Sequence, residues 1–204
     1  MAQSMTPSKT MTAGQFDKTV HTYRALLEKH ASDFPADAVQ TVLGQSELAS
    51  EMFAIFRKRV EALSNLIVRC AKVNRARKPQ EVLDATDRKQ YTDPEVVDSM
   101  PRGEGAEVEV VFFNLDRFVS DADLDKEYEL RGLKPTDPYS LAAVNEADPA
   151  FADEKPNGTH WKDAAGKRCF VTFSRWNGER GVIVGRGAHS WNDHCLFSGL
   201  RKPA

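Results

Sequence analysis

The sequence predicts an α+β protein, in which an N-terminal helical module is followed by a small antiparallel β-meander of about four strands packed with two or three helices. Three observations support this prediction. Apolar residues recur at helical spacing in the first third of the chain. Strand-like segments separated by turn signals fill its C-terminal part. Between the two lie short helix patterns with capping residues at their starts.

The composition is that of an ordinary globular protein. The chain has 204 residues, of which 41% are hydrophobic and 28% charged. No apolar run approaches the roughly 20 residues needed to cross a bilayer, and the N-terminus lacks the apolar stretch of a secretory signal. We therefore expect a cytoplasmic protein without a membrane partner. Its three cysteines, Cys70, Cys169 and Cys195, are expected to be free thiols.

Periodicity and breaker residues divide the chain into segments. The first residues show no periodicity, and a later stretch is poor in apolar residues and rich in breakers. We expect a flexible tail at 1–13, a helical module at 14–79, a linker at 80–106 and a mixed α+β domain at 107–204.

The helical module begins with two predicted helices. Apolar residues recur at intervals of three and four over 15–30, which predicts an amphipathic helix. Pro35 suits a first helical position and Gly44 suits a helix end, so a short helix is expected over 36–43.

A third helix is predicted over 46–78, where neither glycine nor proline occurs before Pro79. Phe56, Val60 and Leu63 belong to a seam with alternating spacings of four and three that lasts about two heptads. Packing within the chain and pairing with a second copy both explain such a seam. A homodimer through helix 46–78 is therefore one expectation.

Local signals in the C-terminal domain predict a strand and the first residues of two helices. Residues 107–113 predict a central strand. Ser120 with Asp123 resembles a helix cap, and Asp137 followed by Pro138 repeats the pattern. The strands and turns of the meander follow these helices.

Charge is distributed unevenly along the chain. Residues 57–78 hold eight basic and one acidic side chain, residues 104–154 hold four basic and fourteen acidic, and residues 155–204 hold nine basic and three acidic. Such segments either pair with one another within the fold or form surfaces for a charged partner. The sequence leaves both readings open.

Direct nucleic-acid binding is one function that these patterns favour. A basic helix over 57–78 would lie along phosphates, and aromatic rings exposed on a basic sheet would stack on bases. A protein partner that meets the same surface is the other reading. The residues predicted for this surface are Arg69, Lys72, Arg75, Arg168, Arg175, Arg186, Trp161, Trp176 and Trp191.

The three tryptophans are each fifteen residues apart. This spacing fits the repeat of an antiparallel meander in which each tryptophan ends a strand beside a turn. Trp176, followed by Asn177 and Gly178, is a good hairpin signal. We expect the three rings to line one rim of the sheet and help cover the helices.

A predicted helix over 121–131 carries acidic residues at intervals of four. Asp121, Asp125 and Glu129 would share one face, which either is solvated or steers a basic partner to the protein. The leading interpretation is a non-enzymatic interaction protein that binds a macromolecular partner through this acidic helix or through the basic aromatic sheet.

Histidines and cysteines near the C-terminus raise two further alternatives. His160, Cys169, His189, His194 and Cys195 lie within 36 residues, but without the close paired spacing of zinc sites, so we expect neither a metal nor a cofactor. An enzyme with a Cys/His site is the other alternative, because the fold and not the spacing brings such a pair together. No catalytic residue is assigned.

One resemblance concerns residues 117–202. The stretch RGLKPTDPYSLAAVNEADPAFADEKPNGTHW, with the later tryptophans and the final Gly and Arg-Lys, resembles the C-terminal part of uncharacterised proteins carried on bacterial integrative elements and plasmids. The resemblance implies a bacterial accessory protein that handles mobile DNA or counters a host defence system. It supplies no catalytic residue.

Overall fold

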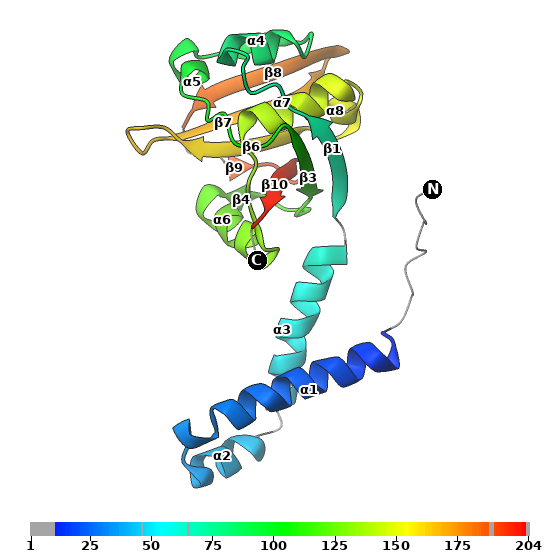
Figure 1. Cartoon of the computed structure of the whole chain (residues 1–204), viewed down its shortest axis with the longest axis vertical. Helices are drawn as coiled ribbons and strands as arrows, with labels where there is room; N and C mark the ends of the chain where they lie inside the picture. Colours follow the sequence, from blue (N-terminus) through cyan, green and yellow to red (C-terminus); the bar gives the residue numbers. More distant parts are fainter. Residues whose placement is uncertain (1–10, 46, 65, 188–189, 203–204) are drawn as a thin grey trace. The chain divides into compact units, whose positions relative to one another are not determined.

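The computed structural model describes residues 11–45, 47–64, 66–187 and 190–202. The chain forms two compact units that divide between Ile55 and Phe56. We call the described residues up to Ile55 the helical unit and those from Phe56 onward the C-terminal domain (Figure 1).

The helical unit contains α1 (Ala13–Lys29), a short 3-10 turn at Ala31–Asp33, α2 (Ala36–Leu43) and the first half of α3 (Glu47–Ser64). A capping box starts α1, because the Thr12 hydroxyl accepts the Gln15 N–H and the Gln15 side chain accepts the Thr12 N–H. Gly44 caps α2 at its C-terminal end as predicted. The predicted tail at 1–13 lies mostly outside the described residues.

The predicted helix over 46–78 is wrong beyond Ser64. Strand β1 (Ile67–Lys72) follows and pairs antiparallel with β3 (Glu107–Phe113). The absence of glycine and proline suits a strand as well as a helix, and pairing with a central strand decides between them. The basic helix expected over 57–78 therefore does not exist as one element.

The segment 80–106, predicted as a linker, belongs largely to the C-terminal domain. Val82, Leu83, Val96 and Val97 from this segment are buried. Prolines begin both of its helices, where their missing N–H costs nothing. The elements are α4 (Pro79–Asp84), β2 (Lys89–Thr92) and α5 (Pro94–Asp98).

The main sheet of the described chain has eight strands, twice the predicted number, and is mixed. Strand β10 runs parallel to β6, and β2 runs parallel to β8, whereas the other pairs are antiparallel. The sheet has the order β1, β3, β10 (Leu196–Arg201), β6 (Asn157–Lys162), β7 (Arg168–Trp176), β8 (Glu179–Arg186), β2, with β5 (Leu133–Pro135) also beside β10.

The predicted antiparallel meander is correct for β7 and β8, whereas β6, which pairs antiparallel with β7 on its other side, was not predicted as a strand. The β7–β8 hairpin turns at Asn177 and Gly178, whose φ angles are 50° and 82°, as expected of an Asn-Gly turn. The last strand departs from the prediction. Instead of pairing with β8, β10 inserts between β3 and β6.

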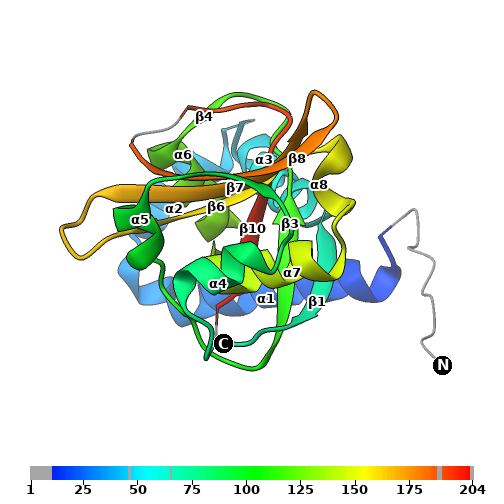
Figure 2. The ribbon, with the colours of Figure 1, turned by 90° about the horizontal axis from the view of Figure 1, so that it is seen from above.

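Two hydrophobic clusters lie on opposite faces of the sheet, because Val110 and Phe112 of β3 belong to one and Val111 and Phe113 to the other. Figure 2 shows helices on both sides of the sheet. Helices α4, α5, α7 (Pro138–Ala147) and α8 (Phe151–Glu154) belong to the larger cluster. Helix α6 (Asp121–Leu130) and the two-stranded sheet of β4 (Val119–Ser120) and β9 (Ser190–Trp191) contribute to the smaller one. Ser120 caps α6 and Asp137 caps α7, both as predicted.

Candidate functional site

The helical unit exposes its apolar side chains. None of the residues of α1 and α2, all of which are described, is buried. Phe16, Val20, Tyr23 and Leu27 follow one another at intervals of four, three and four, so they form one stripe along α1. We call the following exposed apolar side chains the helical face: Phe16, Val20, Tyr23, Leu26, Leu27, Phe34, Val39, Val42, Leu43, Phe53 and Ile55.

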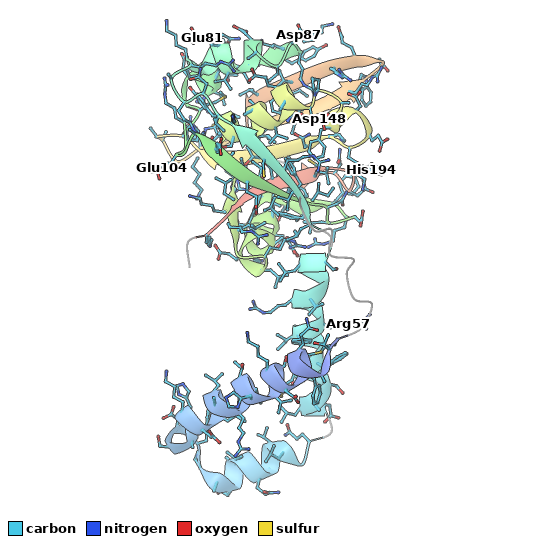
Figure 3. All side chains as sticks on the ribbon, turned by 45° about the vertical axis from the view of Figure 1, so that its right-hand side comes forward. Arg57, Glu81, Asp87, Glu104, Asp148 and His194 are labelled. Atoms are coloured by element: carbon cyan, nitrogen blue, oxygen red, sulfur yellow. The ribbon has the colours of Figure 1, made fainter. Side chains whose placement is uncertain are left out.

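This exposure is energetically unfavourable for an isolated unit. Helices of fewer than about 12–15 residues are marginal in water, and most helical stability comes from burying an apolar face. Helix α1 has 17 residues and α2 has 8, and the two lie side by side without burying either (Figure 3). The sequence predicted amphipathic helices but did not reveal that their faces lack a cover within this unit.

The acidic helix is engaged by its own chain. The indole N–H of Trp191 donates to Asp121 Oδ1 at 2.9 Å, and Arg168 Nη2 donates to Asp125 Oδ2 at 2.6 Å. Glu129 pairs with Lys202. All three acidic residues predicted to receive a basic partner therefore have basic or polar partners within the domain.

His160 of β6 lies in the same cluster. Arg168 Nη1 is 3.4 Å from His160 Nδ1, and Asp125 Oδ1 is 3.4 Å from Nε2, which makes no hydrogen bond to any described residue. Burial lowers the pKa of His160, and Arg168 lowers it further, although Asp125 acts in the opposite direction. The ring is therefore neutral near pH 7 and Nδ1 is suited to accept from Arg168.

Three basic residues predicted on one helix have three different environments. Arg75 donates to Asp137 and to the Ser140 hydroxyl, and also to the backbone carbonyls of residues 102, 104 and 105. Arg69 lies over the ring of Phe151, with its Cζ 4.6 Å from the ring centre. The side chain of Lys72 is 87% exposed. They do not form one basic surface.

The predicted basic residues of the sheet are also paired. Arg175 and Arg180 both bond Asp153 of α8, at 3.2 and 2.7 Å. Arg186 lies 3.2 Å from Asp163 and 3.6 Å from Glu95. The pairs of Arg168, Arg175 and Arg180 join the basic C-terminal segment to the acidic segment before it, whereas the partners of Arg186 lie outside that acidic segment. Mutual pairing of charged segments thus accounts for much of the uneven charge.

The three tryptophans do not line one rim, so that expectation is wrong. Trp161 is 8% exposed in the larger cluster, and Trp191 is 5% exposed in the smaller cluster on the other face. Trp161 lies opposite Cys169 near the start of β7, whereas Trp176 ends that strand. Trp176 alone of the three is exposed, at 78%.

A shallow hollow lies at the β7–β8 turn. Its volume is about 480 Å³, and Trp176 adjoins it, because Trp176 pairs with Glu179 across the hairpin. Three cations outnumber two carboxylates in its lining. The lining residues are Asp87, Lys89, Arg175, Gly178, Glu179 and Arg180.

The Cys/His alternative finds little support in the geometry. Burial raises the pKa of Cys195 to about 12, which disfavours a nucleophilic thiolate at neutral pH. Cys169 is buried, and Cys70 is exposed. His194 points to solvent (Figure 3), with Asp193 3.4 Å away, and His189 lies outside the described residues.

The described residues offer no candidate for a metal site or a membrane-spanning helix. Among the described residues, no group of three or more His, Cys, Asp or Glu side chains is placed to hold a metal ion. Nor does that part of the chain contain a helix of the length and apolar character needed to cross a bilayer. No protein-family model matches the chain, and neither a curated protein nor a solved structure is similar to it.

Proposed function

We propose that this chain is a non-enzymatic, cytoplasmic interaction protein and that its helical face binds a macromolecular partner. The observation that supports the proposal is the exposure of eleven apolar side chains in a unit whose helices α1 and α2 bury nothing. Monomeric soluble proteins rarely keep so large an apolar surface open, and such surfaces are typical of binding sites.

The C-terminal domain differs from the helical unit in how its side chains are partnered. Many of its charged side chains pair with one another, as Arg75 does with Asp137 and Arg168 does with Asp125. Most of its apolar residues lie in two buried clusters, although Tyr91, Phe118 and Ile183 are exposed. A role as an accessory or defence-countering factor of a mobile element belongs to the same proposal, and for that role the partner would be a host or element protein.

The proposal is tested by capture with matched tagged variants of the full chain, from a lysate that also contains the untagged wild-type chain, so that a second copy counts as a retained partner. Val20→Glu with Leu27→Glu places two charges in the stripe, and Thr22→Glu with Ala25→Glu places the same two charges on the opposite side of α1. We expect a partner that is retained by the wild type and by the second variant but lost from the first. An identical set of retained proteins for all three chains would contradict the proposal.

Direct binding of single-stranded nucleic acid is the second candidate function, and the hollow beside Trp176 favours it. An exposed indole offers a stacking surface worth about 1–3 kcal/mol per base, and Lys89, Arg175 and Arg180 are within the lining. This narrows the nucleic-acid alternative to the β7–β8 hairpin, because the expected helix over 57–78 is interrupted.

Titration with a short single-stranded oligonucleotide at low and near-physiological salt tests this candidate. Trp176→Ala and Arg180→Ala should each weaken binding several-fold, and the salt dependence should be steep. Arg201→Ala is the matched control, since Arg201 is also an exposed arginine in an ion pair, with Glu109. Absence of binding at low salt would exclude this function.

A further inference from the structure

The helical face is large enough for one stable interface. Its four aromatic side chains are 42–62% exposed, and because a buried aromatic side chain covers roughly 150–250 Å², they expose on the order of 400 Å². The seven aliphatic side chains, 39–63% exposed, add a comparable area. A standard interface buries about 800 Å² on each partner. The helical unit therefore meets this requirement by itself.

The character of the face indicates a permanent partner. The stripe of α1 contains no charged side chain. The charged residues Asp17, Lys18, Arg24 and Glu28 lie on the other sides of the helix. Interfaces that form and dissociate are about as apolar as ordinary surface, but homodimer interfaces are more apolar and depleted in charge. Such a face suits a permanent partner that is always available to the chain.

The charges that flank the stripe do not select a charged partner. Helix α1 carries two acidic and three basic side chains, and Arg24 already pairs with Glu28 at 2.8 Å. Two copies of α1 packed against each other thus meet with nearly balanced charge. A strongly basic or acidic ligand would gain little from this surface.

We propose that the occupant of the helical face is a second copy of this chain, bound in a two-fold arrangement in which each copy covers the face of the other. This inference rests on the proposed function and names its partner. In a two-fold interface the same patch serves both subunits, so the assembly closes at two chains. The earlier expectation placed such pairing on helix 46–78, of which residues Ile67–Lys72 form strand β1.

Light scattering and sedimentation of the purified full chain over a dilution series test the proposal. The wild type and Thr22→Glu/Ala25→Glu should have the mass of a dimer at micromolar concentration. Val20→Glu/Leu27→Glu should be a monomer, with the dissociation constant raised at least about 100-fold. Far-UV circular dichroism confirms the helices in each variant, and tryptophan fluorescence confirms the C-terminal domain, to which all three tryptophans belong.

A wild type that is monomeric at every concentration would overturn the inference. Binding of a hydrophobic dye to the monomer then tells whether the proposed function fails as well. If the monomer binds the dye and the stripe variant does not, the face is open and takes a different partner, so only the second copy is excluded. If the monomer binds no dye, both proposals fail. A stripe variant that stays dimeric would place the interface elsewhere and would also overturn the inference.

Discussion

Phe112 and Phe173 of the C-terminal domain are completely buried, whereas Phe16 and Phe53 of the helical unit are 61% and 62% exposed. The same side chain thus contributes to stability in one unit and is available for binding in the other. The contrast extends to charge, since the domain's arginines are held by its own carboxylates. The domain thus pairs many of its charged groups internally and buries most of its apolar side chains, whereas α1 and α2 bury none.

Truncation of a buried ring gives the largest effect expected from this contrast. Phe173→Ala removes a side chain with no exposed area and should lower the free energy of unfolding by about 3–5 kcal/mol. Phe16→Ala should change the same transition by less than about 0.5 kcal/mol. Urea unfolding followed by far-UV circular dichroism, to which the helices of both units contribute, measures both, and equal losses would erase the distinction between the two units.

Loss of the Arg75 guanidinium should be the next largest effect. The side chain of Asp137 is only 8% exposed, so Arg75→Ala leaves a nearly buried carboxylate without its cation, at a cost of about 3 kcal/mol. Lys72 lies three residues before Arg75, at an exposed position of β1. Lys72→Ala should therefore cost less than about 0.5 kcal/mol. Urea midpoints of the two variants compare them directly, and similar midpoints would contradict the assigned network.

This difference changes how a nucleic-acid experiment must be designed. Replacing Arg69, Lys72 and Arg75 together would destabilise the domain through Arg75, and lost binding would then have no clear meaning. Single exposed positions such as Lys72 avoid that confusion. The structure therefore restricts which basic residues can be used to test binding.

The pH dependence of stability examines the His160 cluster. Burial beside Arg168 lowers the pKa of His160 below its unfolded value of about 6.5, so the unfolded chain binds the proton more readily. The free energy of unfolding should therefore rise with pH below about 6.5, by at most about 1.4 kcal/mol per pH unit, and level off above it. Asp125, Asp121, Arg168 and Lys162 are the charged groups that act on the ring.

Urea unfolding between pH 5.5 and 7.5 measures this dependence in the wild type and in His160→Gln. The substitution should flatten the profile in that window, whatever its effect on stability at pH 7.5. His21→Gln, at an exposed position of α1, is the control and should leave the profile as it was. A slope that survives His160→Gln would assign the dependence to other groups.

The sequence predicted those elements that local signals define. The Asn-Gly hairpin, the Ser120 and Asp137 caps and the strand at 107–113 all follow from residues close to one another. Strand β1 and the position of β10 depend instead on pairing with β3, which is distant in sequence. Local patterns do not encode such pairing.

The candidate sites were less predictable than the fold, for a related reason. Arg168, Asp121, Asp125 and Trp191 were all singled out, but as members of separate surfaces, whereas the structure places them in one cluster. Asp153, which receives two arginines, was not singled out at all. Amphipathic helices were predicted, but periodicity does not tell whether the apolar side has a cover within the chain.

The smallest expected effect concerns Trp176, the exposed tryptophan of the C-terminal domain. Because 78% of its surface is accessible, Trp176→Ala should change the free energy of unfolding by less than about 0.5 kcal/mol. The same substitution should remove most of the fluorescence that aqueous iodide quenches, since Trp161 and Trp191 are 8% and 5% exposed. Unchanged quenching in the variant would mean that a second indole is open to water. A large loss of stability would instead make Trp176 part of the core, and the hairpin would then be excluded as a binding surface.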